Sequence, residues 1–475
     1  MAKNATTPLS KTPSGISGLD EVTQGGLPTG RPTLICGSAG CGKTLFGVQF
    51  LVKGILDYNE PGVFMSFEET VKDLSVNVKS LGFPLDKLAA EKKLRIDYVR
   101  VERSEIEETG EYDLEGIFIR LNHAIDSIGA KRVVLDTIES LFGGIENAAI
   151  LRSELRRLFQ WLREKGVTVV ITGERGEKAL TRQGLEEYVS DCVILLDFRV
   201  ADQIATRRLR IVKYRGSEHG TNEYPFLIDD QGISVIPITS LQLNHSVSKE
   251  IISTGIPMAD KLFDSGGVFK GSSLLLTGSA GTAKTIMASS FALASCKRNE
   301  RTLYFSYEES KEQLLRNMMS VGINLRTYLQ SGLLRVQSVR PSLSGLEMHL
   351  MMILKLMEEF KPQTVVIDPI SSLLSIGSIS EVRDILIRVI DMLKTKKINA
   401  FFTSLTQAGS SVDDSTVLAV SSLADIWIEL TNDCREQQLG RNMRVIKARG
   451  MSHEMQPQPF STTSKGIIDP RPLKK

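Results

Sequence analysis

Short apolar runs alternate with longer amphipathic stretches along most of this chain. In the first half the runs are four to six residues long, which is typical of buried strands, and the stretches between them carry apolar residues at helical spacing. Strands are expected at residues 33–36, 63–66, 94–98, 132–135, 167–172, 193–196 and 208–212, and helices from residue 43 and at 72–81, 114–128 and 151–165. This alternation predicts an α/β fold whose mainly parallel sheet is covered by helices on both faces.

The second half repeats the same order of elements. Strands are expected there at residues 274–277, 302–306, 334–337, 364–367, 400–403 and 426–430. A repeat of this length indicates the duplication of a whole domain, because solenoid repeats have periods of roughly 20 to 50 residues. The sequence therefore predicts two tandem domains at residues 15–240 and 254–455, a polar linker at 241–253, and flexible ends at 1–14 and 456–475.

Each half contains a phosphate-binding loop between an expected strand and an expected helix. In such a loop, backbone N–H groups and the helix N-terminus surround the phosphates, a lysine neutralises the β/γ charge and a threonine reaches Mg²⁺. We therefore predict two P-loop domains that use ATP and Mg²⁺ as cofactors. The candidate nucleotide-binding residues of the loops are Gly37, Gly40, Cys41, Gly42, Lys43, Thr44 and Leu45, and then Gly278, Gly281, Thr282, Ala283, Lys284, Thr285 and Ile286.

A pair of glutamates follows each loop at matched spacing. Glu68 and Glu69 begin 25 residues after the first loop lysine, and Glu308 and Glu309 begin 24 residues after the second. Each pair ends the next expected strand, beside the predicted γ-phosphate, where a carboxylate can activate water or a hydroxyl group. An isolated Glu-Glu pair is usually a solvated helix start, but its recurrence in both halves favours a catalytic role for all four residues.

An aspartate ends a matched apolar strand in each half. Asp136 follows residues 132–135, and Asp368 follows residues 364–367. In nucleotide-hydrolysing sites a carboxylate at this point acts on the metal ion. The candidate metal ligands are Thr44 and Asp136 in the first half, and Thr285, Glu308 and Asp368 in the second.

A Lys-x-Arg-Gly motif recurs late in each half. Its candidate nucleotide-binding residues are Lys213, Tyr214 and Arg215 in the first half, and Lys447, Ala448 and Arg449 in the second. On a strand the two cations of a motif point to one face, which on a solvated strand means little. Because each motif lies far in sequence from its own loop, we interpret the cations as fingers that reach the nucleotide of a neighbouring subunit.

Composition narrows the classes of function. The chain is 41% hydrophobic and 24% charged, and its net charge is +2. This is the profile of an ordinary globular protein, and the basic signature of a dedicated DNA binder is absent, so a DNA partner is not expected. The five cysteines lack CxxC spacing, so neither zinc nor disulfides are indicated and a cytoplasmic location is expected. Neither a signal peptide nor a membrane anchor is expected.

Several further segments are specific in combination with the two loops. They are Gly25-Gly26-Leu27-Pro28, Phe67-Glu68-Glu69-Thr70, Glu187-Tyr188-Val189-Ser190-Asp191, Glu223-Tyr224-Pro225-Phe226 and Glu308-Glu309. From about residue 11 to residue 453 the chain resembles the KaiC family, the tandem RecA-like ATPases and autokinases of circadian systems. The resemblance implies a double-ring homohexamer with ATP at the subunit interfaces. It also implies nucleotide contacts at Ser80, Ser217, His219 and Arg441.

The family resemblance also assigns different chemistry to the two halves. It implies that the first domain is a slow ATPase and that the second phosphorylates an adjacent pair of hydroxyl residues, which corresponds to Ser421-Ser422. When Asp191 is aligned with Asp425, the first half carries Glu187-Tyr188 in place of that pair. Only the second half could therefore run a serine kinase at this position. A Ser-Ser pair before a strand is by itself usually a turn feature.

The family resemblance implies a KaiB-like partner that docks on the first domain, at the acidic stretch of residues 102–113. The sequence departs from the family pattern in two informative places. Ala283 replaces the last loop glycine, but Lys284 and Thr285 remain, so nucleotide binding is expected to survive. The C-terminal tail does not resemble the segment that recruits the activator KaiA, so no dependence on KaiA is expected.

These observations favour a KaiC-like ATPase and serine/threonine autokinase and autophosphatase of a circadian-clock or related stress-response system. Two other classes share the expected fold, which cannot separate them. One is a DNA-dependent ATPase like RecA or a hexameric helicase, and the near-neutral charge weighs against it. The other is a signalling scaffold that uses ATP only for assembly, and the presence of both glutamate pairs weighs against that.

Overall fold

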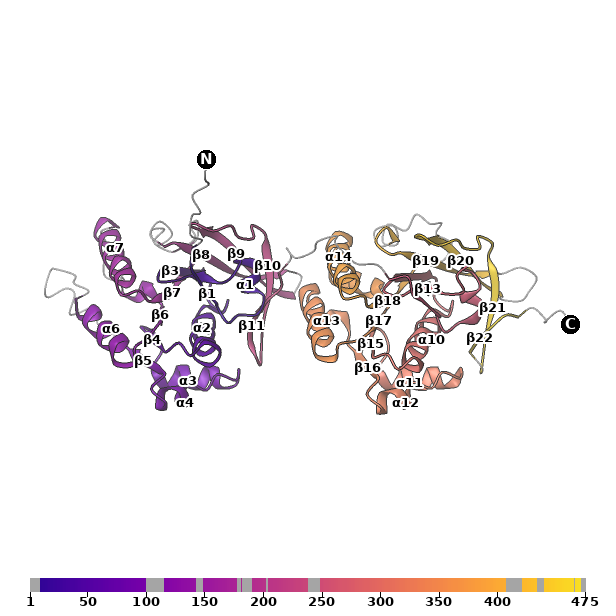
Figure 1. Cartoon of the computed structure of the whole chain (residues 1–475), viewed down its shortest axis with the longest axis horizontal. Helices are drawn as coiled ribbons and strands as arrows, with labels where there is room; N and C mark the ends of the chain where they lie inside the picture. Colours follow the sequence, from indigo (N-terminus) through magenta and orange to yellow (C-terminus); the bar gives the residue numbers. More distant parts are fainter. Residues whose placement is uncertain are drawn as a thin grey trace. The chain divides into compact units, whose positions relative to one another are not determined.

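The computed structural model divides the chain into two compact units, Met1–Ser240 and Leu241–Lys475 (Figure 1). It describes residues 9–99, 115–141, 148–176, 181, 190–201, 204–237, 248–406, 421–433, 440–464 and 466–470. Within these residues each unit contains one nine-stranded sheet and one small two-stranded sheet. The expected α/β fold with mainly parallel sheets is confirmed in both units.

The first unit alternates strands and helices around its large sheet. Its elements are β1 (Lys11–Thr12), α1 (Leu19–Val22), β2 (Leu27–Pro28), β3 (Pro32–Gly37), α2 (Lys43–Tyr58), β4 (Gly62–Ser66), α3 (Val71–Lys79), α4 (Leu85–Ala90), β5 (Leu94–Tyr98), α6 (Glu115–Ile128), β6 (Arg132–Asp136), η1 (Ile138–Leu141), α7 (Ala148–Glu164), β7 (Thr168–Glu174), β8 (Cys192–Ala201), β9 (Ile204–Tyr214), β10 (Glu223–Asp229) and β11 (Gly232–Val235).

The large sheet of the first unit has the order β11-β10-β9-β8-β3-β7-β6-β4-β5. The strands from β8 to β5 are parallel, and β9, β10 and β11 extend the sheet antiparallel. Side chains of the central strand β3 alternate between two cores. Ile35 packs with α2, α3 and α4, whereas Leu34 and Cys36 pack with α6 and α7 on the other face. This two-residue alternation places the phosphate-binding loop after a strand that is buried on both faces.

The second unit repeats this plan. Its elements are β12 (Ile251–Ile252), α9 (Pro257–Asp260), β13 (Val268–Phe269), β14 (Ser273–Gly278), α10 (Lys284–Lys297), β15 (Thr302–Ser306), α11 (Lys311–Ser320), α12 (Arg326–Gln330), β16 (Leu334–Ser338), η2 (Pro341–Leu343), α13 (Leu346–Phe360), β17 (Thr364–Asp368), η3 (Ile370–Ser375), α14 (Ile379–Thr395), β18 (Asn399–Leu405), β19 (Ile426–Asp433), β20 (Gly440–Ala448), β21 (Gln458–Thr463) and β22 (Gly466–Ile468).

The large sheet of the second unit has the order β16-β15-β17-β18-β14-β19-β20-β21-β22. Helices α10 and α11 pack on one face through a continuous hydrophobic core, and α13 packs against α14, which contacts β18. Two helices begin at capping boxes that satisfy their first N–H groups. Ser310 with Gln313 caps α11, and Ser378 with Glu381 caps α14.

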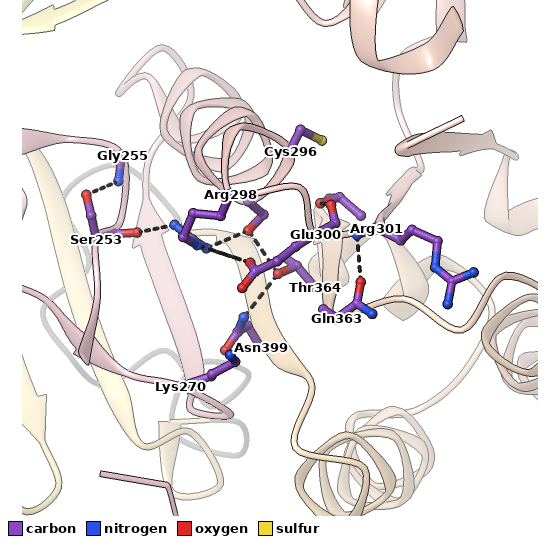
Figure 2. A network of polar contacts seen from close by, with 12 residues as sticks. Ser253, Gly255, Lys270, Cys296, Arg298, Glu300, Arg301, Gln363, Thr364 and Asn399 are labelled. Carbon is purple, nitrogen blue, oxygen red and sulfur yellow. Dashed lines mark hydrogen bonds and ion pairs between the residues drawn. The ribbon is translucent and has the colours of Figure 1, made fainter. Parts of the chain in front are cut away.

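An ion-pair network stabilises the end of α10 in the second unit (Figure 2). Arg298 donates hydrogen bonds to the Ser253 carbonyl oxygen at 3.0 Å and to the Glu300 carboxylate at 2.9 Å, so it connects the segment after β12 to the connection before β15. In the first unit, Glu60 occupies the position equivalent to Glu300. Its partner comes instead from strand β6, where Arg132 is fully buried. The two units therefore neutralise the same acidic position with cations from different elements.

Short strands lie within the segments for which flexible ends and a linker are expected. Residues 11–12 form β1, which pairs with β2, and residues 458–463 form β21, which pairs with β20. Residues 466–468 extend the sheet as β22, and residues 251–252 in the expected linker pair with β13. At the C-terminal end the physical reason is that β20 would otherwise leave backbone N–H and C=O groups unpaired, and residues 458–463 pair with it although Pro459 has no N–H to donate.

Candidate functional site

The first phosphate-binding loop connects β3 to α2. Gly40 and Gly42 have φ angles of +73° and +104°, a left-handed backbone that glycine adopts without steric cost. The Lys43 ammonium donates to the carbonyl oxygens of Gly37 at 2.9 Å and Ser38 at 3.1 Å. These bonds hold the ammonium across the loop, next to the free N–H groups that begin α2. The arrangement is an anion site of the kind that binds nucleotide phosphates.

The second loop makes the same contacts with a different residue at its last turn. Lys284 donates to the Gly278 carbonyl oxygen at 2.7 Å and to that of Ser279 at 2.8 Å. Ala283 stands where the first loop has Gly42, and it adopts the left-handed conformation with φ +74° and ψ 25°. That conformation costs an alanine about 1–2 kcal/mol. The loop therefore keeps its lysine contacts despite the alanine.

The residue directly before Gly42 in the first loop, and the one directly before Ala283 in the second, support their loops from inside the protein. Cys41 and Thr282 are fully buried. A Cβ atom added to Gly37 would lie 2.5 Å from the Cys41 sulfur, and one added to Gly278 would lie 2.6 Å from the Thr282 hydroxyl oxygen. Both first glycines are thus required by close packing. Of the residues after the loop threonines, Leu45 is buried and Ile286 is half-buried.

The candidate metal ligands of the first site lie together. The Thr44 hydroxyl donates to Asp136 Oδ2 at 3.0 Å, and the Thr172 hydroxyl donates to the other carboxylate oxygen. Burial raises the pKa of Asp136, hydrogen bonds from Thr172 and Thr44 lower it, and the nearby charges of Glu68 and Glu69 raise it further. Two oxygen ligands beside a phosphate-binding loop are the donor set that Mg²⁺ prefers, so this site fits the ion.

The aspartate of the second site has different partners. The Thr403 hydroxyl donates to Asp368 Oδ1, as Thr172 does in the first site. Oδ2 accepts a hydrogen bond of 2.8 Å from the phenol of Tyr304, which is fully buried. Within the described residues, the hydroxyl of Thr285 makes no hydrogen bond to Asp368. The oxygen ligands expected from the sequence are present, but they are not linked as they are in the first site.

In each glutamate pair the two carboxylates have different partners. Glu68 accepts a hydrogen bond of 2.8 Å from Ser140, on η1 directly after the strand that ends at Asp136, the candidate metal ligand. Glu69 lies within 3.4 Å of the Asn77 side-chain amide on α3. The first glutamate is thus held on the side of Asp136, and the second is held by a neighbouring helix.

The second site repeats this arrangement. Glu308 accepts from Ser372 at 3.1 Å, and Glu309 accepts from Asn317 at 3.0 Å. The carboxylates of Asp368 and Glu308 both act on Lys284, whose pKa is lowered by burial and raised by these two charges. Motif analysis of the sequence missed the serine and asparagine partners. The spacing from the aspartate to the serine is the same in both halves, and so is the spacing from the second glutamate to the asparagine. A comparison of the two halves could therefore have identified these partners.

The Lys-x-Arg motif of the first unit does not lie near its own loop. The Arg215 N–H donates to the Asp191 carbonyl oxygen, and the Asp191 N–H donates to the Pro32 carbonyl oxygen, so Arg215 is level with the start of β3. The loop begins at Gly37, five residues further along that strand. At about 3.3 Å per residue this is roughly 17 Å. The motif therefore lies at the amino-terminal ends of the parallel strands, whereas the loop lies at their carboxyl ends.

The second unit also places its motif at the amino-terminal ends of the parallel strands, beside the candidate phosphoacceptors. The Lys447 ammonium donates to the carbonyl oxygens of Ser421 and Ala424, both at 2.8 Å, and Arg449 donates to that of Ser422 at 2.6 Å. The side chain of Ser421 is buried, whereas Ser422 is exposed. The cations and the candidate acceptor pair therefore lie in direct contact.

Comparison with known proteins identifies the family. A family model described as "ATPase: KaiC" matches residues 12–240 and 252–470. The chain belongs to the KaiC family. The circadian clock protein KaiC2 of Synechocystis sp. is 55% identical over 460 residues, which is 97% of this chain and 81% of the relative. The circadian clock oscillator protein KaiC of Synechococcus elongatus is 36% identical over 460 residues, which is 96% of this chain and 88% of the relative.

This KaiC-family chain is therefore an ATP-binding ATPase with two RecA-like domains, and the resemblance noted in the sequence is confirmed. The relatives give no support to the DNA motor or to the scaffold. Among the helices of the described residues, none is long and apolar enough to span a membrane. The acidic stretch at 102–113 and the Glu187-Tyr188 pair lie outside the described residues.

The remaining candidate residues of this KaiC-family chain have local partners. The Tyr214 hydroxyl donates to the Gly26 carbonyl oxygen at 2.9 Å, so this side chain belongs to the core of the first unit. The Ser217 hydroxyl donates to the Glu218 carbonyl oxygen, and His219 Nδ1 lies 3.0 Å from that of Gly220. Ser80 is the C-cap of α3, Ala448 ends β20, and Arg441 donates to the Thr462 hydroxyl at 2.8 Å.

Proposed function

We propose that this chain is a serine autokinase and autophosphatase as well as an ATPase. In this proposal it works as a homohexamer that binds Mg–ATP at the subunit interfaces. One observation carries the proposal. Lys447, Arg449 and the acceptor segment lie together at the amino-terminal ends of the parallel strands, whereas the loop of their own domain lies at the carboxyl ends.

The spacing across the sheet supports transfer between subunits. The Asp425 N–H donates to the Ser273 carbonyl oxygen, so the acceptor segment is level with the start of β14. Gly278 begins the loop five residues further along, roughly 17 Å away. No serine side chain spans that distance. The phosphoryl group that reaches Ser421 or Ser422 must therefore come from another subunit, whose loop would face this edge in a closed ring.

The residues of each site suggest how they divide the chemistry. Mg²⁺, when bound, supplies positive charge to the β- and γ-phosphates, and Thr44 with Asp136 would hold it in the first site. Lys43 binds the same phosphates. Glu68 accepts a proton from the attacking water, and its hydrogen bond from Ser140 keeps the carboxylate turned toward the metal-ligand aspartate.

In the second site the nucleophile is a serine hydroxyl of the neighbouring subunit. Lys284 binds the γ-phosphoryl group, and Glu308 accepts the hydroxyl proton. The positive charges of Lys447 and Arg449 arrive with the acceptor, because they hold its backbone carbonyl groups. They would thus stabilise charge on the phosphoryl group only when the acceptor is in position. The equivalent fingers of the first domain are Lys213 and Arg215.

The relatives' names suggest the biological context. Both compared KaiC proteins are named circadian clock proteins, and we propose a role in a clock or related stress-response system. We also propose a KaiB-like partner on the first domain, no need for a KaiA-type activator, and a cytoplasmic location. A pull-down with the KaiB-like protein of the same organism, repeated with ATP, with ADP and with phosphorylated protein, tests the partner. Failure to bind in every state would exclude it.

The kinase proposal is tested by incubating the purified full chain with Mg–ATP and mapping phosphate by mass spectrometry. Phosphate is expected on Ser421 or Ser422 without added factors, and Glu308→Gln should lose it because the proton acceptor is removed. The sequence assigned a catalytic role to both glutamates of the pair, and Glu309→Gln separates them. Glu308 is held after the Asp368 strand by Ser372, whereas Glu309 is bonded to Asn317, so Glu309→Gln should retain most of the labelling. Light scattering should find about six chains per particle. An unmodified serine pair in protein that still hydrolyses ATP would exclude the kinase.

A further inference from the structure

The metal-ligand aspartates of the two sites differ at one oxygen. Asp136 Oδ2 accepts its hydrogen bond from the loop residue Thr44, at 3.0 Å. Asp368 Oδ2 accepts instead from the phenol of Tyr304, at 2.8 Å. The other oxygen has the same kind of partner in both sites, a threonine hydroxyl from the next strand. The difference is therefore specific to the oxygen that faces the loop threonine in the first site.

The phenol is an addition of the second half, at a position that the first half fills with phenylalanine. Tyr304 is the third residue of β15 and pairs with Val366, two residues before Asp368. Phe64 is the third residue of β4 and pairs with Val134, two residues before Asp136. Both rings are buried. The backbone register is the same, so the hydroxyl group is the only chemical difference between the two rings.

A second polar residue accompanies the phenol. Ser289 lies five residues after the second loop lysine, is fully buried on α10 and lies beside the Tyr304 hydroxyl. The first half has Val48 at the equivalent point of α2. Within the described residues the Ser289 hydroxyl makes no hydrogen bond, so it adds a polar neighbour to the phenol, and the hydrogen bond from Tyr304 to Asp368 carries the argument.

This hydrogen bond has a consequence for the metal site. A neutral donor on Oδ2 withdraws negative charge and occupies a lone pair that would otherwise serve Thr285 or a metal-bound water. The Tyr304 ring is fully buried in the hydrophobic core of the second unit. Resting on the proposed use of Mg–ATP, we propose that Tyr304 is a positioning residue that restrains Asp368 and makes the second site require more Mg²⁺ for nucleotide than the first.

The substitution Tyr304→Phe tests the proposal and copies the ring of the first half, so the fold tolerates it. Trp161 and Trp427 are the two tryptophans of the chain, one in each unit. With Trp161→Phe, Trp427 on the strand beside β14 reports a fluorescent N-methylanthraniloyl-ATP by energy transfer. Full-length protein is titrated with buffered Mg²⁺. The half-saturating Mg²⁺ concentration should fall about fivefold, the equivalent of one hydrogen bond of about 1 kcal/mol.

Two controls make the result specific. Tyr307 is a buried tyrosine three residues further on, and its hydroxyl has no hydrogen-bond partner within the described residues, so Tyr307→Phe should leave the Mg²⁺ requirement unchanged. The reciprocal change Phe64→Tyr with Val48→Ser, measured with Trp427→Phe, should raise the requirement of the first site. An unchanged requirement in Tyr304→Phe overturns the inference. Phosphate mapping on the same samples tests the kinase proposal separately. If no phosphate were found on the serine pair, the kinase proposal would fall, but a shift in the Mg²⁺ requirement would still support the role of Tyr304.

Discussion

Removing either partner of the Arg132–Glu60 ion pair should have unequal effects on the stability of the first domain. Arg132 is 0% exposed, and its Nε donates to Glu60 at 2.6 Å while Nη1 donates to the Phe50 carbonyl oxygen at 2.9 Å. The guanidinium also lies over the rings of Phe50 and Tyr58, at 4.6 Å and 5.4 Å from their centroids. Its Nη2 is buried without a hydrogen bond in the described part of the chain.

These contacts set the expected magnitudes. Glu60→Gln leaves the buried guanidinium charge uncompensated, which costs about 3–5 kcal/mol in a fully buried pair. The Glu60 side chain is 35% exposed, so water can approach and the lower end of about 3 kcal/mol applies. Arg132→Met keeps the contacts with the rings, removes the unpaired Nη2 and lets Glu60 hydrate. Its cost should be about 1 kcal/mol or less.

The assay uses one tryptophan as a reporter of the first domain. With Trp427→Phe, only Trp161 remains, and it packs on Phe118 with 5.4 Å between ring centroids. Thermal unfolding followed by its fluorescence should place Glu60→Gln below Arg132→Met by about 4–8 °C, because a domain of this size shifts by about 2–4 °C per kcal/mol. Equal midpoints, or a lower midpoint for Arg132→Met, would refute the argument that the buried charge dominates.

Ala283→Gly should stabilise the second domain by up to about 1 kcal/mol, because it removes a left-handed alanine. Gly42→Ala should destabilise the first domain by more, since a methyl group there would lie 2.9 Å from a side-chain carbon of Ile228. Tryptophan fluorescence during unfolding measures both changes in stability. Burial raises the pKa of Asp425, but hydrogen bonds from Lys394 and a backbone N–H lower it more, so the net pKa is below its ordinary value. The resulting stability is present above pH 4 and lost as pH falls through the lowered pKa, and Lys394→Met should shift acid unfolding of the second domain to higher pH. Glu68→Gln should remove most steady-state ATP hydrolysis while phosphorylation of the second domain persists, and loss of phosphorylation with intact turnover would reverse the roles.

The sequence predicted those parts of the fold and of the candidate site that depend on residues close together in the chain. Lys43 and Thr44 were predicted from strand–loop–helix order, and Asp136 from its place at the end of an apolar strand. The structure brings Thr44 and Asp136 together because parallel strands place their carboxyl ends on the same side of the sheet. It did not predict strands β10, β11 and β20 to β22, since antiparallel extensions of a sheet depend on which edge is left unpaired. The bond between Tyr304 and Asp368 was also missed. It joins residues that are distant in sequence, and a tyrosine in an apolar strand is indistinguishable there from any other core aromatic.

The most direct test of the account is complementation between two inactive variants. Lys284→Ala keeps the proposed acceptor serines but lacks the loop lysine. The double variant Ser421→Ala with Ser422→Ala keeps the loop but lacks the proposed acceptor. Because the acceptor edge and the loop of one domain are roughly 17 Å apart, phosphate should be absent from each variant alone. In mixed hexamers it should appear on the Lys284→Ala chain. Phosphate on the Lys284→Ala variant alone, or none in mixtures that assemble while the wild type is labelled, would contradict transfer between subunits.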